Sequence, residues 1–252
     1  MRIPLEKIAN YQGDFDAEYC TINGYDPRVT QGEQETMFFA TLDSYNQIRI
    51  YEWKWDKQEM AFTDLNIDPW GDAYDSIGPG GEPWLGSMGP NITAAWISPD
   101  ELNITKTLGF AWTAGRDDSH PYPHIRIALI KKNEKGEYDV FNQPHIWNAS
   151  FAFAYPSICA NKKGQIGISL FFGGNILYPS HAVGIYDTKN KRWKINWTAL
   201  GTDCPNDNEW GDYLTIRPHP TKNNTWITSG FTLNGGPRTK DLSIKFIQFE
   251  SN

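Results

Sequence analysis

Cysteine is scarce in this chain, and long apolar runs are absent. The three cysteines, Cys20, Cys159 and Cys204, lie far apart, with neither a CxxC pair nor the Cys/His spacing of a zinc site. At most one disulfide can form from them, and we predict buried free thiols instead. No stretch of about 18 or more apolar residues occurs, which excludes a membrane-spanning helix.

Basic residues are not in excess either. Lysine and arginine number 23 against 30 aspartates and glutamates, which gives a formal net charge of -7. This balance offers no electrostatic footprint for nucleic acid or anionic lipid, so we expect neither as a partner. The start of the chain, Met1 to Lys7, lacks the apolar core of a secretory signal. Either the protein is intracellular or the chain begins after a removed segment, and the second case favours an extracellular or periplasmic location.

The common catalytic signatures are missing too, since the chain contains no GxSxG, HExxH, phosphate-binding loop or dinucleotide fingerprint. Aromatic residues, in contrast, make up 14% of the chain and include 11 Trp, beside 22 Gly and 16 Pro. This composition favours many short strands separated by turns over helices. A chain of 252 residues is long enough to bury a sizeable core in one domain.

A strand pattern repeats along the chain. Apolar and polar residues alternate from Gln47 to Trp55, as in a half-buried strand, and turns join similar runs into antiparallel meanders. Four-stranded meanders that repeat roughly every 45 to 55 residues are the signature of a β-propeller. We therefore predict one all-β domain, a β-propeller of about four to five blades in this chain or part of a larger propeller, with a β-sandwich as the alternative. An irregular lead-in is expected over 1–35 and blade-like units over about 36–68, 91–147, 152–200 and 209–252.

Two features of the pattern are irregular. The last unit shows three strands where four are expected, so either the lead-in supplies the missing outer strand or the chain is part of a longer propeller. A Gly/Pro-rich connection runs from Pro69 to Pro90, and long connections of this kind often cover a site.

Three stretches carry a family resemblance: 154–158, 167–174 and the motif Trp210-Gly211-Asp212-Tyr213. With them the chain resembles bacterial secreted proteins of the sialidase-like, WGDY-containing β-propeller group, many of which have no established activity. The resemblance covers roughly the C-terminal 100 residues and elsewhere only the repeat pattern. It implies the propeller fold and an extracellular, carbohydrate-related role. The Asp box of true sialidases is absent, because Asp187 to Trp193 shares only its hairpin outline.

The resemblance also implies a set of site residues. Sialidase-type hydrolysis needs a tyrosine nucleophile beside a glutamate, a carboxylic acid, and arginines that hold the substrate carboxylate. The predicted catalytic residues are Glu209, Asp212 and Tyr213, and the predicted substrate-binding residues are Arg2 and Arg217. His181 is added to the substrate-binding residues on another ground, because it stands at the start of a predicted strand, where we expect it to face the channel. The opposing interpretation is structural: Trp210 packs between blades, Gly211 permits a tight turn, and Asp212 accepts backbone hydrogen bonds, because a motif that recurs usually serves the repeat.

Metal sites are not predicted. His120 and His124 resemble a ligand pair, but Pro121 and Pro123 exclude the helix that would place both imidazoles on one face, so we expect a solvated loop. Oxygen ligands near Asp203 are the sole Ca²⁺ candidate, and the spacing of an EF-hand loop is missing. We therefore predict no cofactor, with Ca²⁺ left open.

Two functional hypotheses follow. The first is a sialidase-like propeller that binds, and in its stronger form hydrolyses, a glycan at the channel mouth, where Trp and Tyr faces stack on sugar rings. The second is a non-enzymatic scaffold that binds a protein, motivated by the missing Asp boxes. Binding to glycans together with the effect of changing Glu209 and Asp212 would separate the two.

Overall fold

The computed structural model describes residues 28–32, 35–54, 59–86, 88–99, 106–205, 210–211, 214–235 and 241–251. These residues form strands, turns and extended connections, and none of them lies in a helix. Among them, accordingly, no helix is long and apolar enough to cross a membrane.

Two antiparallel sheets make up the first half of the chain. The first has the strand order β1-β2-β3-β4, and the second has the order β5-β6-β7-β8 with the short β9 paired to β7. The strands of the first sheet are β1 (Arg28–Val29), β2 (Thr36–Ser44), β3 (Gln47–Lys54) and β4 (Glu59–Asn66). Those of the second are β5 (Ile92–Pro99), β6 (Lys106–Ala114), β7 (His124–Lys132), β8 (Tyr138–Asn142) and β9 (His145–Ile146).

Two further antiparallel sheets follow in the same manner. The third has the order β10-β11-β12-β13, and the fourth, in its described residues, has the order β14-β15-β16. The third contains β10 (Ala152–Ala160), β11 (Ile166–Gly174), β12 (Leu177–Asp187) and β13 (Arg192–Ala199). The fourth contains β14 (Thr215–Pro218), β15 (Thr225–Leu233) and β16 (Leu242–Glu250).

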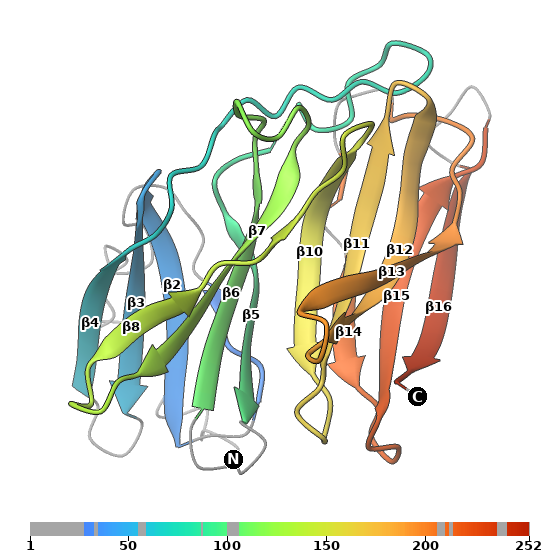
Figure 1. The fold of residues 1–252 in the computed structure, drawn as a ribbon. Coiled ribbons are helices and arrows are strands. Elements are labelled where there is room, and N and C mark those ends of the chain that lie inside the picture. The colour runs from blue at the N-terminus through green and yellow to red at the C-terminus, as the bar shows by residue number, and fades with distance from the viewer. Residues whose placement is uncertain are drawn as a thin grey trace, which may run out of the picture.

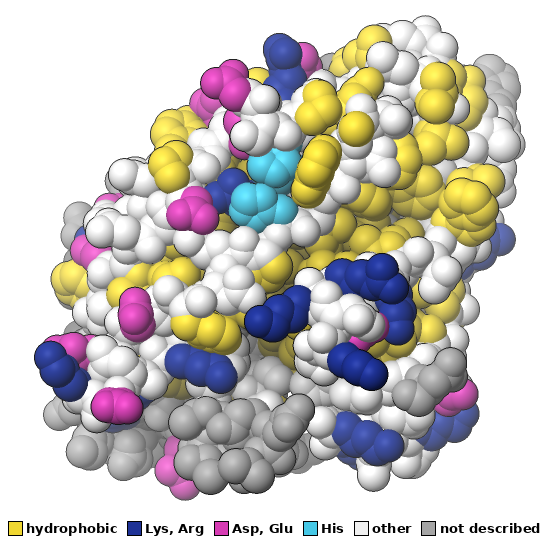
Figure 2. All heavy atoms as spheres, viewed as in Figure 1, with side chains coloured by type: hydrophobic (Ala, Val, Ile, Leu, Met, Phe, Trp, Pro, Cys, Tyr) yellow, Lys and Arg dark blue, Asp and Glu magenta, His cyan; other side chains and the backbone are white. Residues whose placement is uncertain are grey.

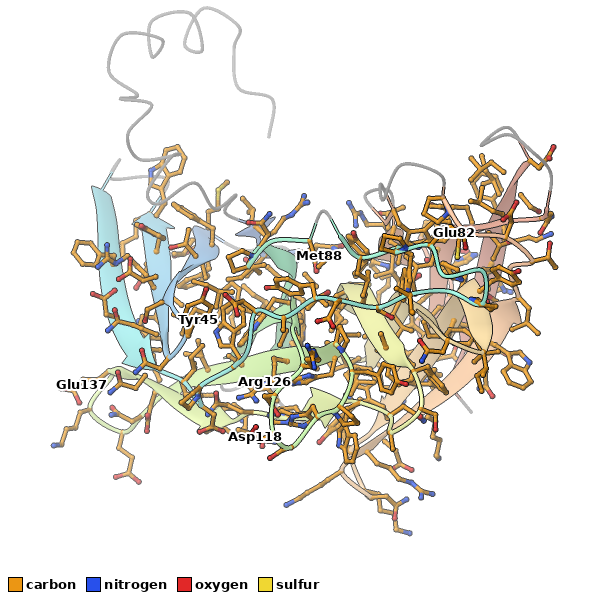
Figure 3. The ribbon with its side chains drawn as sticks, turned by 90° about the horizontal axis from the view of Figure 1, so that it is seen from above. Tyr45, Glu82, Met88, Asp118, Arg126 and Glu137 are labelled. Atoms are coloured by element: carbon orange, nitrogen blue, oxygen red, sulfur yellow. The ribbon has the colours of Figure 1, made fainter. Side chains whose placement is uncertain are left out.

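The four sheets lie side by side in chain order, as both the front view and the view from above show (Figures 1 and 3). The first strand of each later sheet is its innermost one: β10 packs against β5 on one side and β14 on the other, and β1 packs against β5. Sequential meanders packed face to face around their first strands define an all-β propeller. The predicted fold class is confirmed.

The described end of the lead-in joins the first sheet. β1 pairs with β2, and Gln31 continues from it to pair with β5, donating to Ala95 O at 3.0 Å and accepting from the Ile97 amide at 3.0 Å. The lead-in thus adds an innermost strand to the first sheet in this part of the chain. An outer strand supplied by it to the fourth sheet is not seen among the described residues, and residues 1–27 lie outside them.

The apolar core lies between the sheets. On β5, Trp96 faces the third sheet while Ala95 and Ile97 face the first, because neighbouring side chains on a strand point to opposite faces. A strand that is packed on both faces has a nearly continuous run of apolar residues. The inner strands β5 and β10 both show such a run. Separate clusters join the first sheet to the second, the second to the third, and the third to the fourth.

Two strands begin earlier than the sequence predicts. The sequence predicts strands that start at Pro156 and at His181, with a loop over 173–180 before the second, whereas β10 starts at Ala152 and β12 at Leu177. β10 instead includes Pro156 within a β-bulge between Ala154 and Ser157, where Tyr155 adopts a positive φ of 53°. The Tyr155 amide, turned out of the ladder, donates to Thr113 Oγ1 at 2.9 Å on β6.

The connection between β4 and β5, residues 67–91, forms a strap over the upper ends of the sheets (Figure 1). In Figure 3 it extends from the side of Tyr45 to Glu82, above the third and fourth sheets, and returns past Met88. Backbone hydrogen bonds join it to 115–116 on the second sheet. Fully buried Trp84 anchors its far end, with Nε1 donating to Ser76 Oγ at 3.0 Å.

The cysteines behave as predicted where they are described. Cys159 and Cys204 are buried free thiols, and burial raises their pKa values to about 12 and about 11. Cys20 lies outside the described residues.

Candidate functional site

The WGDY motif is packed into the molecule where it is described. Trp210 is buried against Trp84 of the strap, Phe171 of β11 and Phe231 of β15. This confirms the structural interpretation for Trp210.

Gly211 is required by both its backbone and its surroundings. Its φ is 101°, and a Cβ placed on it would lie 2.3 Å from the Tyr155 ring. Only glycine fits there, which agrees with the structural interpretation of this position. Glu209, Asp212 and Tyr213 lie outside the described residues, so their catalytic roles stay predictions, as does the substrate-binding role of Arg2.

His181 lies in the interface between the third and fourth sheets. It is fully buried on β12, with Nε2 2.8 Å from Ser169 Oγ and Nδ1 2.5 Å from Thr198 Oγ1. A Cβ on Gly230 of β15 would come within 2.2 Å of the ring, so this glycine makes room for the imidazole. Burial lowers the His181 pKa to about 4. Contact between a substrate and this ring would require the interface to open.

Arg217 lies at the far end of β14 from the WGDY motif. The separation can be measured along β10. Tyr155 of this strand lies beside Gly211, whereas Ala160 of the same strand lines a cavity together with Arg217. Five residues of a β-strand span roughly 15 Å. The structure therefore does not bring Arg217 together with Trp210 and Gly211.

The cavity beside Arg217 is formed where the innermost strands end, and we call it the channel-end cavity. It has a volume of about 790 Å³ and is lined by Gln31, Gly32, Ile97, Pro99, Lys106, Cys159, Ala160, Asn161, Lys162, Arg217 and Pro218. The described lining therefore includes three cationic side chains and no carboxylate. Arg217 Nη1 donates to Gln31 Oε1 at 3.0 Å and to Ile216 O at 2.8 Å, which fixes the guanidinium across the gap between the fourth and first sheets.

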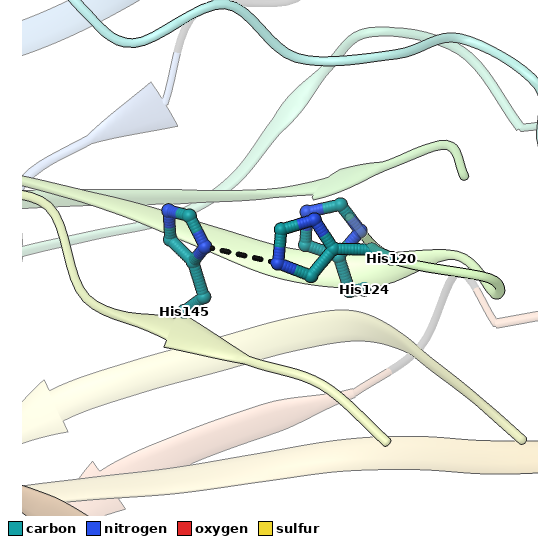
Figure 4. A group of neighbouring side chains, drawn as sticks. All are labelled: His120, His124 and His145. Carbon is teal, nitrogen blue, oxygen red and sulfur yellow. Dashed lines mark hydrogen bonds between the residues drawn. The ribbon is translucent and has the colours of Figure 1, made fainter. Parts of the chain in front are cut away.

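A second cluster consists of His120, His124 and His145 (Figure 4). His124 begins β7 and His145 begins β9, whose pairing places His145 directly opposite Arg126. Residues two apart on a strand share a face, so His124, Arg126 and His145 all project to the same side. His120 comes from the turn before β7, and its ring stacks on His124 with centroids 3.9 Å apart.

Hydrogen bonds hold the His120 ring at both nitrogens, whereas three ring nitrogens of His124 and His145 have no partner among the described residues. Asp117 Oδ1 lies 2.8 Å from His120 Nδ1 and also accepts from the Ser119 and His120 amides. His145 Nδ1 lies 3.2 Å from His120 Nε2. Both ring nitrogens of His124 and Nε2 of His145 are buried with no hydrogen-bond partner among the described residues.

Burial favours the neutral forms of His124 and His145. Burial and the nearby His120 lower the His124 pKa to about 3, and burial and Arg126 lower the His145 pKa to about 4. Burial opposes ionisation of Asp117, but the hydrogen bonds from His120 and the Ser119 amide outweigh it, so the pKa of this carboxyl is lowered. Neutral imidazoles beside a carboxylate are the forms that ligate a metal ion.

The solvated loop expected at 120–124 is wrong. His120 is 8% exposed and His124 0%, because a turn followed by a strand stacks the two rings without any helix. The sequence missed His145 altogether, because only the pairing of β9 with β7 brings it to the others. A His-x-x-x-His pair at the start of a predicted strand was the available signal.

Fold and sites together define an all-β propeller with a cationic channel-end cavity and a separate histidine cluster. Neither a protein-family model nor a curated protein sequence matches this chain. Among solved structures, the α-L-arabinanase of Penicillium chrysogenum complexed with arabinobiose is similar, at 16% identity and a TM-score of 0.44, over 89% of this chain and 63% of that one.

Two further solved structures are similar at the same remote level. An α-L-arabinofuranosidase of Fusarium graminearum with an iminosugar inhibitor shares 8% identity at a TM-score of 0.42, over 90% of this chain and 77% of that one. An α-L-arabinanase mutant of Cellvibrio cellulosa shares 14% identity at a TM-score of 0.40, over 90% of this chain and 70% of that one. Similarities this remote assign neither an activity nor a substrate.

Proposed function

We propose that this propeller binds an acidic glycan, a sugar that carries a carboxylate, in the channel-end cavity. The observation that carries the proposal is the lining itself: Arg217, Lys106 and Lys162 with no carboxylate among the described residues, in a chain of net charge -7. Cations gathered locally on an acidic protein favour an anionic ligand at that place. The volume of about 790 Å³ suits a ligand of one or a few sugar units.

Arg217 is the residue best placed to recognise the carboxylate. Its hydrogen bonds to Gln31 and Ile216 both come from Nη1, so Nη2 and Nε remain to form a forked pair with two carboxylate oxygens. Ile97, Pro99 and Pro218 supply apolar surface for the C–H faces of a sugar ring. This is the substrate-binding role predicted for Arg217, at the channel end away from the WGDY motif.

The proposal concerns binding. Hydrolysis by Glu209, Asp212 and Tyr213 is a separate prediction, because these residues lie outside the described part of the chain. A protein-binding scaffold is the competing function, and it is favoured by the alternating exposed apolar residues Leu242, Ile244 and Phe246 of β16.

Titration calorimetry with matched acidic and neutral oligosaccharides tests the proposal. We expect the acidic sugar to bind more tightly, and Arg217→Ala to weaken it at least about tenfold, as loss of a charge-assisted bidentate pair does. Arg192→Ala, an exposed arginine of β13 outside the cavity, is the matched control and should bind like the wild type. Equal binding by Arg217→Ala, or a folded protein that binds no acidic glycan, would overturn the proposal and favour the scaffold.

A further inference from the structure

We propose that His120, His124 and His145 form a binding site for a transition metal ion, with Zn²⁺ as the best-suited ion. None of the three residues lines the channel-end cavity, so the inference stands apart from glycan binding. Three imidazoles are the donor set that zinc, copper and nickel share, and three-histidine zinc sites leave a fourth position open.

The spacing of the rings fits one ion. One nitrogen from each histidine lies within 4.8 Å of the others. A tetrahedral ion with Zn–N bonds of about 2.0 Å places its ligand nitrogens roughly 3.3 Å apart. Side-chain rotations that close the rings by about 1 to 1.5 Å are therefore enough.

The unpaired nitrogens supply an independent argument. His124 is fully buried with both ring nitrogens lacking a hydrogen-bond partner among the described residues, and His145 Nε2 is in the same condition. Leaving a buried polar group without a partner destabilises the folded state, and native structures rarely tolerate several in one place. A metal ion bound between the rings would satisfy two of these three atoms, His145 Nε2 and one nitrogen of His124, since each imidazole offers the ion one ligand atom.

Asp117 orients His120 as a metal ligand. Its carboxylate lies 2.8 Å from His120 Nδ1 and is itself held by two backbone amides, so His120 is set with Nδ1–H toward Asp117. The lone pair of His120 Nε2 then points toward His145 Nδ1, 3.2 Å away, and a metal ion would replace that hydrogen bond. A carboxylate behind a ligating histidine fixes the ring and raises its basicity as a ligand. The arrangement matches that carboxylate–histidine–metal pattern.

Arg126 opposes a cation at this place, because its buried guanidinium lies on the same face of β7. Its Nη2 donates to Asp68 O at 3.0 Å, and the negative charges of Asp68 and Asp117 stabilise the charged guanidinium. The two carboxylates offset both the guanidinium and part of the charge of a divalent ion. Arg126 therefore lowers the affinity without abolishing the site.

One side of the histidine cluster reaches the surface. His145 is half-buried, and Trp147, 49% exposed, stands edge-on to His120 with centroids 5.4 Å apart. Figure 2 shows histidine side chains reaching the surface beside acidic and basic neighbours. A water molecule or an outside ligand can therefore complete the coordination.

Metal titration of the full chain tests the proposal. After treatment with a chelator, the protein is titrated with ZnCl₂ in competition with a chromophoric chelator, and the intense visible absorption of tetrahedral Co²⁺ is recorded in parallel. We expect one Zn²⁺ per chain with a Kd in the micromolar range or below, and a rise in melting temperature on binding. His145→Gln should weaken binding at least about tenfold, and Asp117→Asn should weaken it by about tenfold or more.

Controls separate the site from other histidines. His219→Gln changes a histidine on a distant turn and should bind zinc like the wild type. If His124→Gln does not fold, His145→Gln and Asp117→Asn still decide the question, because His145 is only half-buried and Asn keeps the shape of Asp. Absence of binding by the folded wild-type chain, or unchanged binding in His145→Gln, overturns the proposal.

Discussion

The buried imidazole of His181 makes the stability of the folded protein depend on pH. Its pKa is about 4 in the folded protein against 6.5 for an unperturbed histidine, and burial is the cause. Because the folded pKa is the lower one, the unfolded chain takes up the proton first as the pH falls. The stability contributed by the neutral ring is therefore complete above about pH 6.5 and is lost as the pH falls toward 4.

His181→Gln should reveal this dependence. A shift of this size corresponds to about 3 kcal/mol between the two ends of the window. We expect the variant to be less stable than the wild type at pH 7.5 by on the order of 1 to 3 kcal/mol, and the difference to shrink or vanish near pH 4.5. Urea unfolding of both proteins in the presence of a chelator measures it, with His219→Gln as the control. A difference that stays constant with pH would contradict the prediction.

Individual residues also show which features of the structure could be predicted from the sequence alone. Trp210 and Gly211 were predictable as packing residues, because a large aromatic beside a glycine in a repeated motif has an evident local role. The positive φ of Tyr155 was not predictable, since it depends on Thr113 of another strand accepting the displaced amide. His145 joins the histidine cluster through strand pairing, which local spacing does not encode.

Among the elements, the alternation of apolar and polar residues predicted a strand correctly, whereas the predicted starts of two other strands were wrong. The run from Gln47 to Trp55 predicts β3, which the structure places at Gln47–Lys54. The predicted strand starts at Pro156 and His181 are wrong, because a bulge and a register shift let β10 and β12 begin several residues earlier. Irregularities of this kind are set by neighbouring strands, so a single strand's residues do not reveal them.

Trp84 is the largest fully buried side chain of the strap over 67–91. Trp84 is fully buried against Trp210 and close to Gly173, whereas Ile77 in the same strap is 44% exposed. Trp84→Ala should destabilise the protein by about 3 to 5 kcal/mol, because it leaves a large cavity beneath the strap. It should also make the strap the first site of limited proteolysis.

Ile77→Ala is the matched control for the strap and should change stability by less than about 0.5 kcal/mol. Thermal unfolding and mass spectrometry of the first proteolytic fragments measure both effects. First cleavage elsewhere in the Trp84 variant would show that another part of the molecule, and not the tryptophan anchor, limits opening.

For the molecule as a whole, the clusters between sheets set the order of stability. Each sheet packs on its chain neighbours, so stability is approximately a sum of interface contributions, as in other repeat proteins. The fourth sheet is the most weakly held by this criterion. Beside the cluster that includes Trp210 and Leu233, a small cluster of the buried residues Cys159, Ile216 and Trp226 joins it to the third sheet, and every side chain of β16 is exposed or half-buried.

We therefore expect native-state hydrogen exchange to show the fourth sheet opening at a lower free energy than the second and third. Trp226 should control this opening, because it is fully buried, stacks on Phe249 at 5.2 Å and donates from Nε1 to Cys159 O at 3.2 Å. Trp226→Leu should speed exchange in β15 and β16 at least about tenfold, equivalent to 1.4 kcal/mol, while β6 and β7 keep their protection. Trp197→Leu, at a tryptophan 70% exposed, should leave exchange unchanged. Uniform acceleration across all four sheets would instead show that the propeller opens as one cooperative unit.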